Sequence, residues 1–217
     1  VRLFGKAVDY DFENKIAHFN KGIRLEDSTG VLIANQGSYF EEVDSAVFIG
    51  NVQLSSEEEY AESDRMNIQR KEKRSYLYGQ VLIENLSEQQ MIQSDSVYAD
   101  SLGFHRLMGH AAIRTIDETD ASFVLSNTIL IHDQDSSFSF RTVTTTESWS
   151  ADFSTRSDSL YYESESEQFL LTGEPKVWYD RAELSANTII VQMDSSEIEE
   201  LYLYQNAFTA VENEQSG

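Results

Sequence analysis

The chain has 217 residues, of which 38 are Asp or Glu and 16 are Lys or Arg, so its formal net charge is −22. Such an acidic surface repels the phosphate backbone of nucleic acids, and we therefore expect neither DNA nor RNA as a partner. The sequence contains no Cys, which excludes a disulfide, a thiolate nucleophile and a Cys-bound zinc ion. It has no run of 18 apolar residues, so we expect no transmembrane span.

A short strand pattern with a central Gly recurs along the chain. Its clearest copy is Tyr76–Ile83, in which Leu77, Val81 and Ile83 fall at alternate positions on one face with Gly79. This period of two predicts a β-strand with one buried face. Copies return every 29 to 32 residues, a spacing typical of repeat architectures. The positions that align with the Gly are Lys21, Gly50, Gly79, Gly109, Arg141, Gly173 and Gln205.

A second pattern lies between the Gly strands and reads small residue, Asp or Asn, any residue, apolar residue. It places successive inward positions three residues apart, which breaks the strand period of two. A bulge or bend at the Asp or Asn would restore the period, because these residues tolerate a left-handed backbone. The sequence therefore predicts two strand units in each repeat. The copies begin at Ala34–Asn35, Ser63–Asp64, Ser94–Asp95, Ser126–Asn127, Ser157–Asp158 and Ala186–Asn187.

These patterns predict an all-β fold of about a dozen or more strands, built as an elongated repeat β-jellyroll (β-taco) or an open β-solenoid. We expect one domain over residues 1–217, with an ordered core over about residues 1–211. Residues 142–150 fit the repeat least well, and a kink or a loop excursion is expected there. Strands near residues 3–8 and 201–208 are expected at the edges of the sheet. Residues 196–199 resemble a helix capping box, but the repeat favours a strand.

One segment is basic in this acidic chain. Five of the 16 basic residues lie within residues 65–74. Two interpretations stay open: a solvated turn that balances nearby acidic residues, or a contact with phosphate.

Motifs that carry enzyme chemistry are missing from the sequence. There is no His-Glu-x-x-His set, no Gly-x-Ser-x-Gly elbow and no Gly-rich phosphate loop. Carboxylate pairs are numerous at this composition, and nothing singles one of them out. We therefore expect a protein that is not an enzyme and that uses no metal or cofactor.

The units Gly50–Leu54 and Ser94–Tyr98 resemble the repeat of the OstA/LptA family, in which Gly-Asn-Val-x-apolar alternates with small-Asp-x-apolar. The resemblance extends over residues 1–211, and the family includes the lipopolysaccharide-transport proteins LptA and LptC and the N-terminal domain of LptD. It implies a β-jellyroll in the periplasm, with outer-membrane association as a further expectation. It also implies that lipopolysaccharide or a related lipid is bound, and that edge strands join the protein to itself or to similar jellyrolls. The acidity departs from what a phosphate-bearing ligand favours.

The resemblance places a groove for lipid acyl chains on the inward positions of the strands. The Gly residues either thin the wall of this groove or only relieve crowding between sheets. Two other functions fit the repeat: a structural or adhesive surface β-solenoid, and a carbohydrate-active β-solenoid enzyme. An open apolar groove favours transport, a closed and filled interior favours the structural role, and a cleft with paired carboxylates favours the enzyme. The residues expected to line the groove are Phe48, Val52, Leu54, Met66, Leu77, Val81, Ile83, Val97, Leu107, Ile113, Ile129, Leu160, Leu171, Val177 and Ile189.

Overall fold

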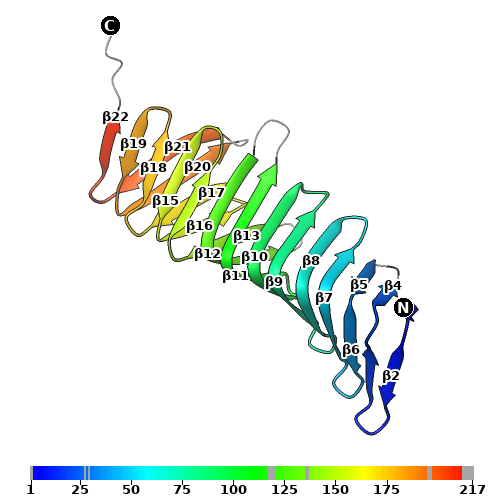
Figure 1. Cartoon of the computed structure of the whole chain (residues 1–217). Coiled ribbons are helices and arrows are strands. Elements are labelled where there is room, and N and C mark those ends of the chain that lie inside the picture. The colour runs from blue at the N-terminus through cyan, green and yellow to red at the C-terminus, as the bar shows by residue number, and fades with distance from the viewer. Residues whose placement is uncertain are drawn as a thin grey trace. The chain divides into compact units, whose positions relative to one another are not determined.

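The computed structural model describes residues 2–26, 28, 30–116, 121–134, 137–194 and 197–211. Regular structure in these residues consists of 22 β-strands, and every described strand pairing is antiparallel. The all-β prediction is confirmed. Two compact units divide the chain, unit 1 over residues 1–109 and unit 2 over residues 110–217 (Figure 1). The single domain expected from the repeat stays a prediction.

Unit 1 consists of short strands at its start and long strands after them. The strand β11 (Phe104–Ile116) crosses from unit 1 into unit 2. The strands before it are β1 (Arg2–Gly5), β2 (Val8–Asp11), β3 (Ile16–Phe19), β4 (Ile23–Glu26), β5 (Val31–Ala34), β6 (Gln36–Phe40), β7 (Ser45–Ser55), β8 (Glu59–Gln69), β9 (Arg74–Asn85) and β10 (Gln90–Asp100).

Unit 1 has two layers of strands. Each passage of the chain, meaning the segment between one turn and the next, contributes to both layers. In layer A, β1 pairs with β4, β4 with β5, and β5 with the end of β7. In layer B, β2 pairs with β3, β3 with β6, and β6 with the start of β7. From β7 to β10 the two halves join into single long strands that belong to one layer before a bend and to the other after it. A Cβ built on Gly37 of layer B would lie 3.3 Å from the Ile23 side chain of layer A, so the two layers face each other.

The bend between the layers is a pair of residues with a left-handed backbone. Gly50 and Asn51 have φ values of 78° and 48°, and Gly79 and Gln80 have φ values of 76° and 46°. On the paired strand β10 only Asp95 stands opposite the second pair, where the register shifts. Two residues facing one define a β-bulge, as the sequence predicts. The left-handed residues nevertheless lie on the Gly strand and not at the Asp or Asn.

Two positions of the Gly alignment are wrong. The left-handed residue in the first repeat is Gly22, one residue after Lys21, and in the fifth repeat it is Thr144, three residues after Arg141. Arg141 instead pairs with Leu130 and Tyr161 within a regular strand. The kink or excursion expected over residues 142–150 is therefore the ordinary bend of the repeat, shifted along the chain.

Unit 2 repeats the two-layer plan with strands that are mostly broken at the bend. The strand expected after Ser196 is present as β21, although Ser196 itself and the residues after Val211 lie outside the described residues. The strands are β12 (Ala121–Gln134), β13 (Ser137–Val143), β14 (Thr146–Trp149), β15 (Phe153–Ser157), β16 (Ser159–Glu163), β17 (Gln168–Thr172), β18 (Lys176–Tyr179), β19 (Ala182–Ser185), β20 (Thr188–Asp194), β21 (Glu197–Tyr204) and β22 (Phe208–Val211).

The layers of unit 2 follow from its strand pairing. In its layer A, the first half of β12 pairs with β14, which is followed by β15, β18, β19 and β22. In its layer B, the second half of β12 pairs with β13, which is followed by β16, β17, β20 and β21. Successive passages run in opposite directions, which matches the folded sheet of a jellyroll more closely than a coil that winds in one sense.

The edge strands lie where the sequence predicts them. Among the described pairings, β1 has β4 as its one neighbour and β2 has β3. In unit 2, β21 is described as paired with β20 alone and β22 with β19 alone. In the described pairings, each of these four strands therefore leaves one row of backbone N–H and C=O groups without a strand partner.

Candidate ligand-binding interior

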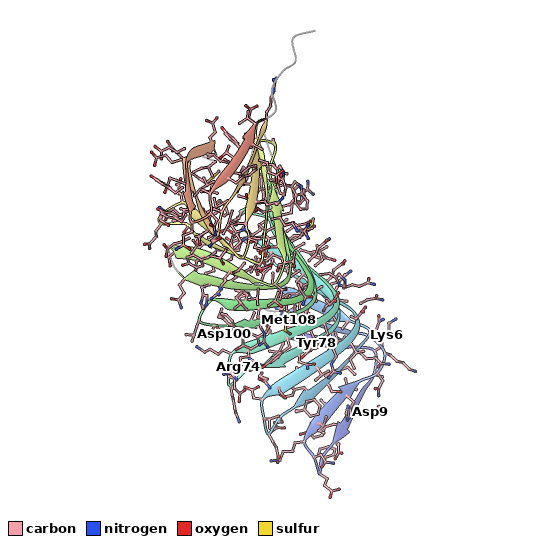
Figure 2. All side chains as sticks on the ribbon, turned by 90° about the vertical axis from the view of Figure 1, so that its left-hand side faces the viewer. Lys6, Asp9, Arg74, Tyr78, Asp100 and Met108 are labelled. Carbon is pink, nitrogen blue, oxygen red and sulfur yellow. The ribbon has the colours of Figure 1, made fainter. Side chains whose placement is uncertain are left out.

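The residues predicted to line a groove do point into the interior of their unit. In the central strand of unit 1, Leu77 and Val81 are buried, whereas Gln80 and Tyr78 (labelled in Figure 2) are exposed, as the alternation predicts. Leu54 and Ile83 are half-buried at the ends of their strands. The other predicted groove residues are all buried: Phe48, Val52, Met66, Leu77, Val81, Val97 and Leu107 in unit 1, and Ile113, Ile129, Leu160, Leu171, Val177 and Ile189 in unit 2.

Strand register aligns these residues into apolar rows that run across unit 1. In layer B, Phe48 pairs with Met66, Met66 with Leu77, and Leu77 with Val97. All four residues are buried, so the row presents an unbroken apolar surface to layer A. Burial of apolar area of this kind is the main source of stability in such a fold.

The row next to the bend in layer A alternates small and larger residues. Val52 pairs with Ser63, and Val81 pairs with Ser94. The two Ser hydroxyls donate to backbone carbonyl groups two residues further on, at distances of 3.2 and 3.1 Å. This contact explains the small residue before each Asp, because a buried hydroxyl needs a hydrogen-bond partner and the bend provides one.

The Gly residues provide the left-handed backbone of the bend and lie close to an Asp of the neighbouring strand. A Cβ built on Gly79 would lie 2.3 Å from the Oδ2 atom of Asp64, on the paired strand. Gly109 and Asp95 show the same relation at 2.2 Å. Asp64 and Asp95 are both exposed. A side chain on either Gly would therefore meet the Asp of the neighbouring passage.

The interior of unit 2 contains a hydroxyl cluster that sequence reasoning missed. Thr142 of layer B and Thr146 of layer A are both 0% exposed, and their Oγ1 atoms lie 2.6 Å apart. The backbone N–H of Leu160 donates to Thr142 Oγ1 at 2.8 Å. A second buried pair, Ser148 and Thr155, has its hydroxyl oxygens 2.6 Å apart. The cluster is polar but satisfied, and its first pair joins the two layers across the interior.

Aromatic side chains close unit 2 at the ends of the strands far from the bend. Ring centroids are 5.5 Å apart between Phe140 and Tyr162, and 4.6 Å apart between Tyr162 and Phe169. Phe169 of layer B also meets Phe153 of layer A, with a centroid distance of 6.5 Å. Burial, with a smaller effect from the charge of Glu167, raises the pKa of Tyr162, so its hydroxyl stays neutral at physiological pH.

Burial of these side chains limits how the interior could accept a ligand. Side chains fill the space between the layers at the buried positions, so a bound chain would have to displace side chains or separate the layers. Across the described residues, no group of three or more His, Cys, Asp or Glu is placed to hold a metal ion. That same part of the chain contains no helix of the length and apolarity needed to cross a membrane.

The fold places this chain among all-β proteins built from two-layer repeats, in which bent antiparallel strands enclose an apolar interior. Residues 1–64, which form β1 to β7 and the first half of β8, match the sequence profile of the family described as OstA-like protein. Over these residues the chain is similar to that family, and the predicted family resemblance is confirmed there. Comparison with curated proteins found no match.

Solved structures give a weaker comparison. One similar structure is LptH from Pseudomonas aeruginosa, described as the LptA homologous periplasmic component of the lipopolysaccharide transport device. It shares 8% identity with this chain, and the alignment covers 71% of this chain and 95% of LptH with a TM-score of 0.28.

Proposed function

We propose that this protein carries lipopolysaccharide or a related lipid through the periplasm as part of outer-membrane biogenesis, and that it holds the acyl chains between its two layers. The observation that carries the proposal is the OstA-like match of residues 1–64. The same bend and the same inward rows continue through the rest of unit 1 and recur in unit 2. We therefore extend the OstA-like assignment to the remainder of the chain.

The apolar rows give the proposal its energetic basis. Each CH₂ group of an acyl chain gains about 0.8 kcal/mol on leaving water for an apolar interior. A row such as Phe48, Met66, Leu77 and Val97 offers several strands of continuous apolar contact. Because these side chains are buried against layer A, binding requires the layers to move apart, and lipid contacts replace the side-chain contacts that are lost.

The edge strands support an assembly of several such units into a bridge. Strand addition at an unpaired edge forms main-chain hydrogen bonds with a partner. The edge of unit 1 carries Phe4, Val8 and Tyr10 in exposed positions, and Phe12 in the following turn is 85% exposed. The edge of unit 2 carries exposed Tyr204 and Phe208. Another copy or another jellyroll of the same kind would cover these apolar side chains.

A photo-crosslinking experiment tests lipid binding. A photoreactive amino acid is placed at Val81 in unit 1 or Ile113 in unit 2, both buried, with exposed Tyr78 as the outward control. We expect a lipopolysaccharide adduct at the two inward positions in cells and none at Tyr78. No adduct at any inward position would overturn the proposal.

The filled interior favours one alternative, a structural repeat that binds no lipid. A covalent clamp separates the two functions. The chain has no Cys, so Phe153→Cys with Phe169→Cys and a bismaleimide crosslinker would tie layer A to layer B in unit 2. If the protein carries lipid, the clamp should abolish the adduct at Ile113 and leave the far-UV spectrum unchanged. A structural repeat would give no adduct in either state.

A further inference from the structure

The turns at the layer B end of unit 1 stack on one another through the backbone. The N–H of Glu41 donates to the carbonyl of Lys15 at 3.1 Å, and the N–H of Arg70 donates to the carbonyl of Asp44 at 3.0 Å. The N–H of Ser101 continues the series to the carbonyl of Lys73 at 3.2 Å. These hydrogen bonds hold four successive turns side by side, so their side chains form one continuous surface.

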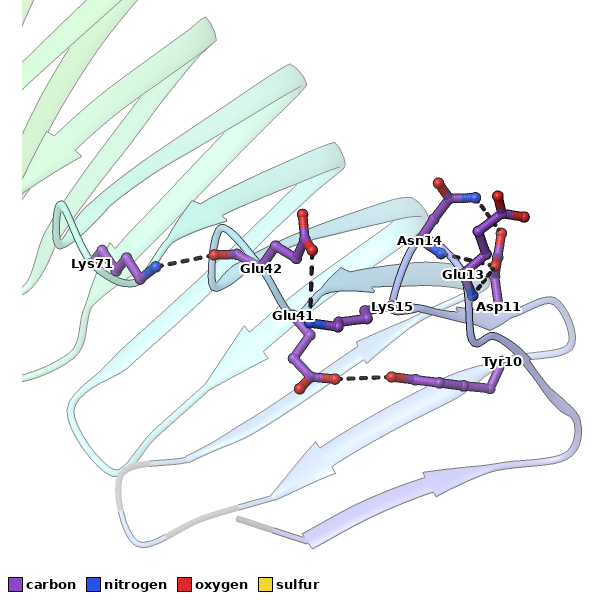
Figure 3. Close-up of polar contacts among 8 residues, drawn as sticks. All are labelled: Tyr10, Asp11, Glu13, Asn14, Lys15, Glu41, Glu42 and Lys71. Carbon is purple, nitrogen blue, oxygen red and sulfur yellow. Dashed lines mark hydrogen bonds and ion pairs between the residues drawn. The ribbon is translucent and has the colours of Figure 1, made fainter.

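The charges on this surface are uneven. The turn at residues 41–44 is acidic, and donor groups from the preceding and following turns lie against it (Figure 3). Lys15 forms a 3.7 Å ion pair with Glu42, and Lys71 donates to the Glu42 carbonyl at 3.1 Å. Tyr10 donates its hydroxyl to Glu41 at 2.9 Å. The two Glu residues of the acidic turn are therefore supplied with donors without using Arg70, Lys73 or Arg74.

Those remaining cations surround a pocket of about 310 Å³, between the turn at residues 70–73 and the turn at residues 101–103. Arg70, Lys73 and Arg74 line it, together with the hydroxyl-bearing side chains of Ser75 and Ser101. Guanidinium, ammonium and hydroxyl groups are the donors that proteins use to bind phosphate.

The cations of the pocket are weakly committed to partners within the protein. Arg70 Nε lies 3.9 Å from Asp44, at the limit of an ion pair. In the described part of the chain, no carboxylate lies within 4.0 Å of the Lys73 ammonium or the Arg74 guanidinium. They can therefore bind an anion without first breaking an internal salt bridge.

One carboxylate, Asp100, also lines the pocket and pairs in register with Arg74 (Figure 2). Partial desolvation pushes its pKa upward, but hydrogen bonds from the Leu102 and Phe104 amides and from the Tyr98 hydroxyl outweigh this effect. The charge of Arg74 acts in the same direction, so the pKa lies below its usual range. Asp100 is thus ionised at neutral pH and already satisfied by donors other than the pocket cations.

The pocket lies at the layer B ends of β8, β9 and β10, and both the inward row and the adjacent outward row of residues contribute to its lining. Its apolar residues Ile68 and Ala99 belong to the same register row as Ser75 and the buried Ala46. The apolar interior and the cationic rim therefore meet at this end of the strands. An amphiphile with an anionic head matches this arrangement, with its chains between the layers and its head at the turns.

We infer that this pocket binds a phosphate group, and that Arg70, Lys73 and Arg74 are its main ligands. The inference rests on the proposed function where the phosphate belongs to a lipid, and it assigns that phosphate a place in an otherwise acidic protein. A free phosphate ion or a phosphorylated head group would use the same donors, so the experiment must distinguish these two sources.

The test compares two variants of equal charge in the full chain. Arg70→Gln with Lys73→Gln and Arg74→Gln removes the pocket cations, and Arg24→Gln with Arg156→Gln and Lys176→Gln removes three exposed cations that are paired with carboxylates elsewhere. Calorimetry then measures binding of inorganic phosphate, of lipopolysaccharide, and of lipopolysaccharide from which phosphatase has removed the phosphates. Far-UV spectra establish that both variants are folded.

For a lipid head group, we expect lipopolysaccharide to bind the pocket variant about tenfold or more weakly than the parent and the control variant, because several charge-assisted hydrogen bonds are lost. The dephosphorylated lipid should bind parent and pocket variant equally. Loss of inorganic phosphate binding alone would identify a free phosphate site and still support the pocket. Equal binding of every ligand by both variants would overturn the inference. In that case crosslinking at Val81 would still report on lipid transport, so the two proposals fail separately.

Discussion

The two units share a backbone plan but differ in what they place between their layers. In unit 1 the inward rows are apolar, and the buried polar residues, Ser63 and Ser94, lie beside the bend. In unit 2 the hydroxyl pair Thr142 and Thr146 lies between the layers, with aromatic rings such as Tyr162 beyond it. The difference shows that the repeat specifies the path of the backbone and leaves the chemistry of the interior free to vary.

The bends differ as well. In unit 1 they begin with Gly at left-handed positions, as at Gly22 and Gly79. In unit 2 Gly173 keeps this pattern with a φ of 80°, but Thr144 occupies such a position with a φ of 73°. A β-branched residue is disfavoured there because its Cβ approaches the following carbonyl oxygen. A bend that must be left-handed is therefore maintained by the layers on both sides of it even where the local sequence opposes it.

The largest effect is expected from Gly79→Ala in unit 1. The new Cβ would be forced into a left-handed backbone and against the Asp64 carboxylate, and we expect a loss of about 3 kcal/mol in the free energy of unfolding. Gly22→Ala is the matched control, since Gly22 also has a left-handed φ but no atom within 4 Å of the added Cβ. That variant should lose only about 1 kcal/mol. Hydrogen exchange of unit 1 amides measures both, and equal losses would contradict the role given to Asp64.

Thr142→Val should be the next most harmful change, although the two side chains have nearly the same shape. It leaves the Leu160 amide without the hydroxyl that accepts from it, and the Thr146 hydroxyl keeps the Thr144 carbonyl as its acceptor. An unpartnered donor in a fully buried site costs about 1–3 kcal/mol. Both Trp residues of the chain, Trp149 and Trp178, lie in unit 2, so Trp fluorescence during urea unfolding reports this loss. A variant as stable as the parent would show that the hydroxyl cluster contributes nothing to the closed interior.

The reciprocal change in unit 1 is Val81→Thr. Val81 is 2% exposed and pairs with Ser94, whose hydroxyl is already engaged with a backbone carbonyl. The new hydroxyl would be buried in an apolar row, and we expect a loss of about 1–2 kcal/mol. Far-UV circular dichroism during urea unfolding provides the measurement, with Val81→Ala as a control for lost volume. If neither Thr142→Val nor Val81→Thr changed the free energy of unfolding, the difference between the two interiors would not contribute to stability.

The sequence predicts the parts of this molecule that depend on local periodicity. The alternation in Tyr76–Ile83 correctly assigns Leu77 inward and Tyr78 outward, and the step of three residues at the Asp predicts the bulge. Local patterns could not place the bend at Thr144, because Thr has no preference for a left-handed backbone and only the paired strands hold it there.

The hydroxyl cluster and the phosphate pocket escaped the sequence for a different reason. Thr142 and Thr146 look like breaks in an apolar pattern until the two layers bring their hydroxyls together. The basic residues 65–74 are visible in the sequence, but the pocket also needs Ala99 at the end of β10 and Ser101 in the turn that follows, about 30 residues later. Contacts between layers and between stacked turns are tertiary, and no single segment encodes them.

The smallest effect should be a gain, from Thr144→Gly in unit 2. Gly adopts a φ of 73° without the steric cost that Thr carries there, although it loses more backbone entropy on folding. The Thr144 side chain is exposed, so its removal sacrifices no interior packing, while its carbonyl remains able to accept the Thr146 hydroxyl at 3.0 Å. We expect a net stabilisation of about 0.5–1 kcal/mol, seen as a higher urea midpoint of Trp fluorescence. Thr144→Ala is the control, because it removes the β-branch but keeps a Cβ, and it should gain less than the Gly variant. A destabilised Gly variant would mean that the Thr side chain stabilises this bend, and that the bends of the two units are held by different interactions.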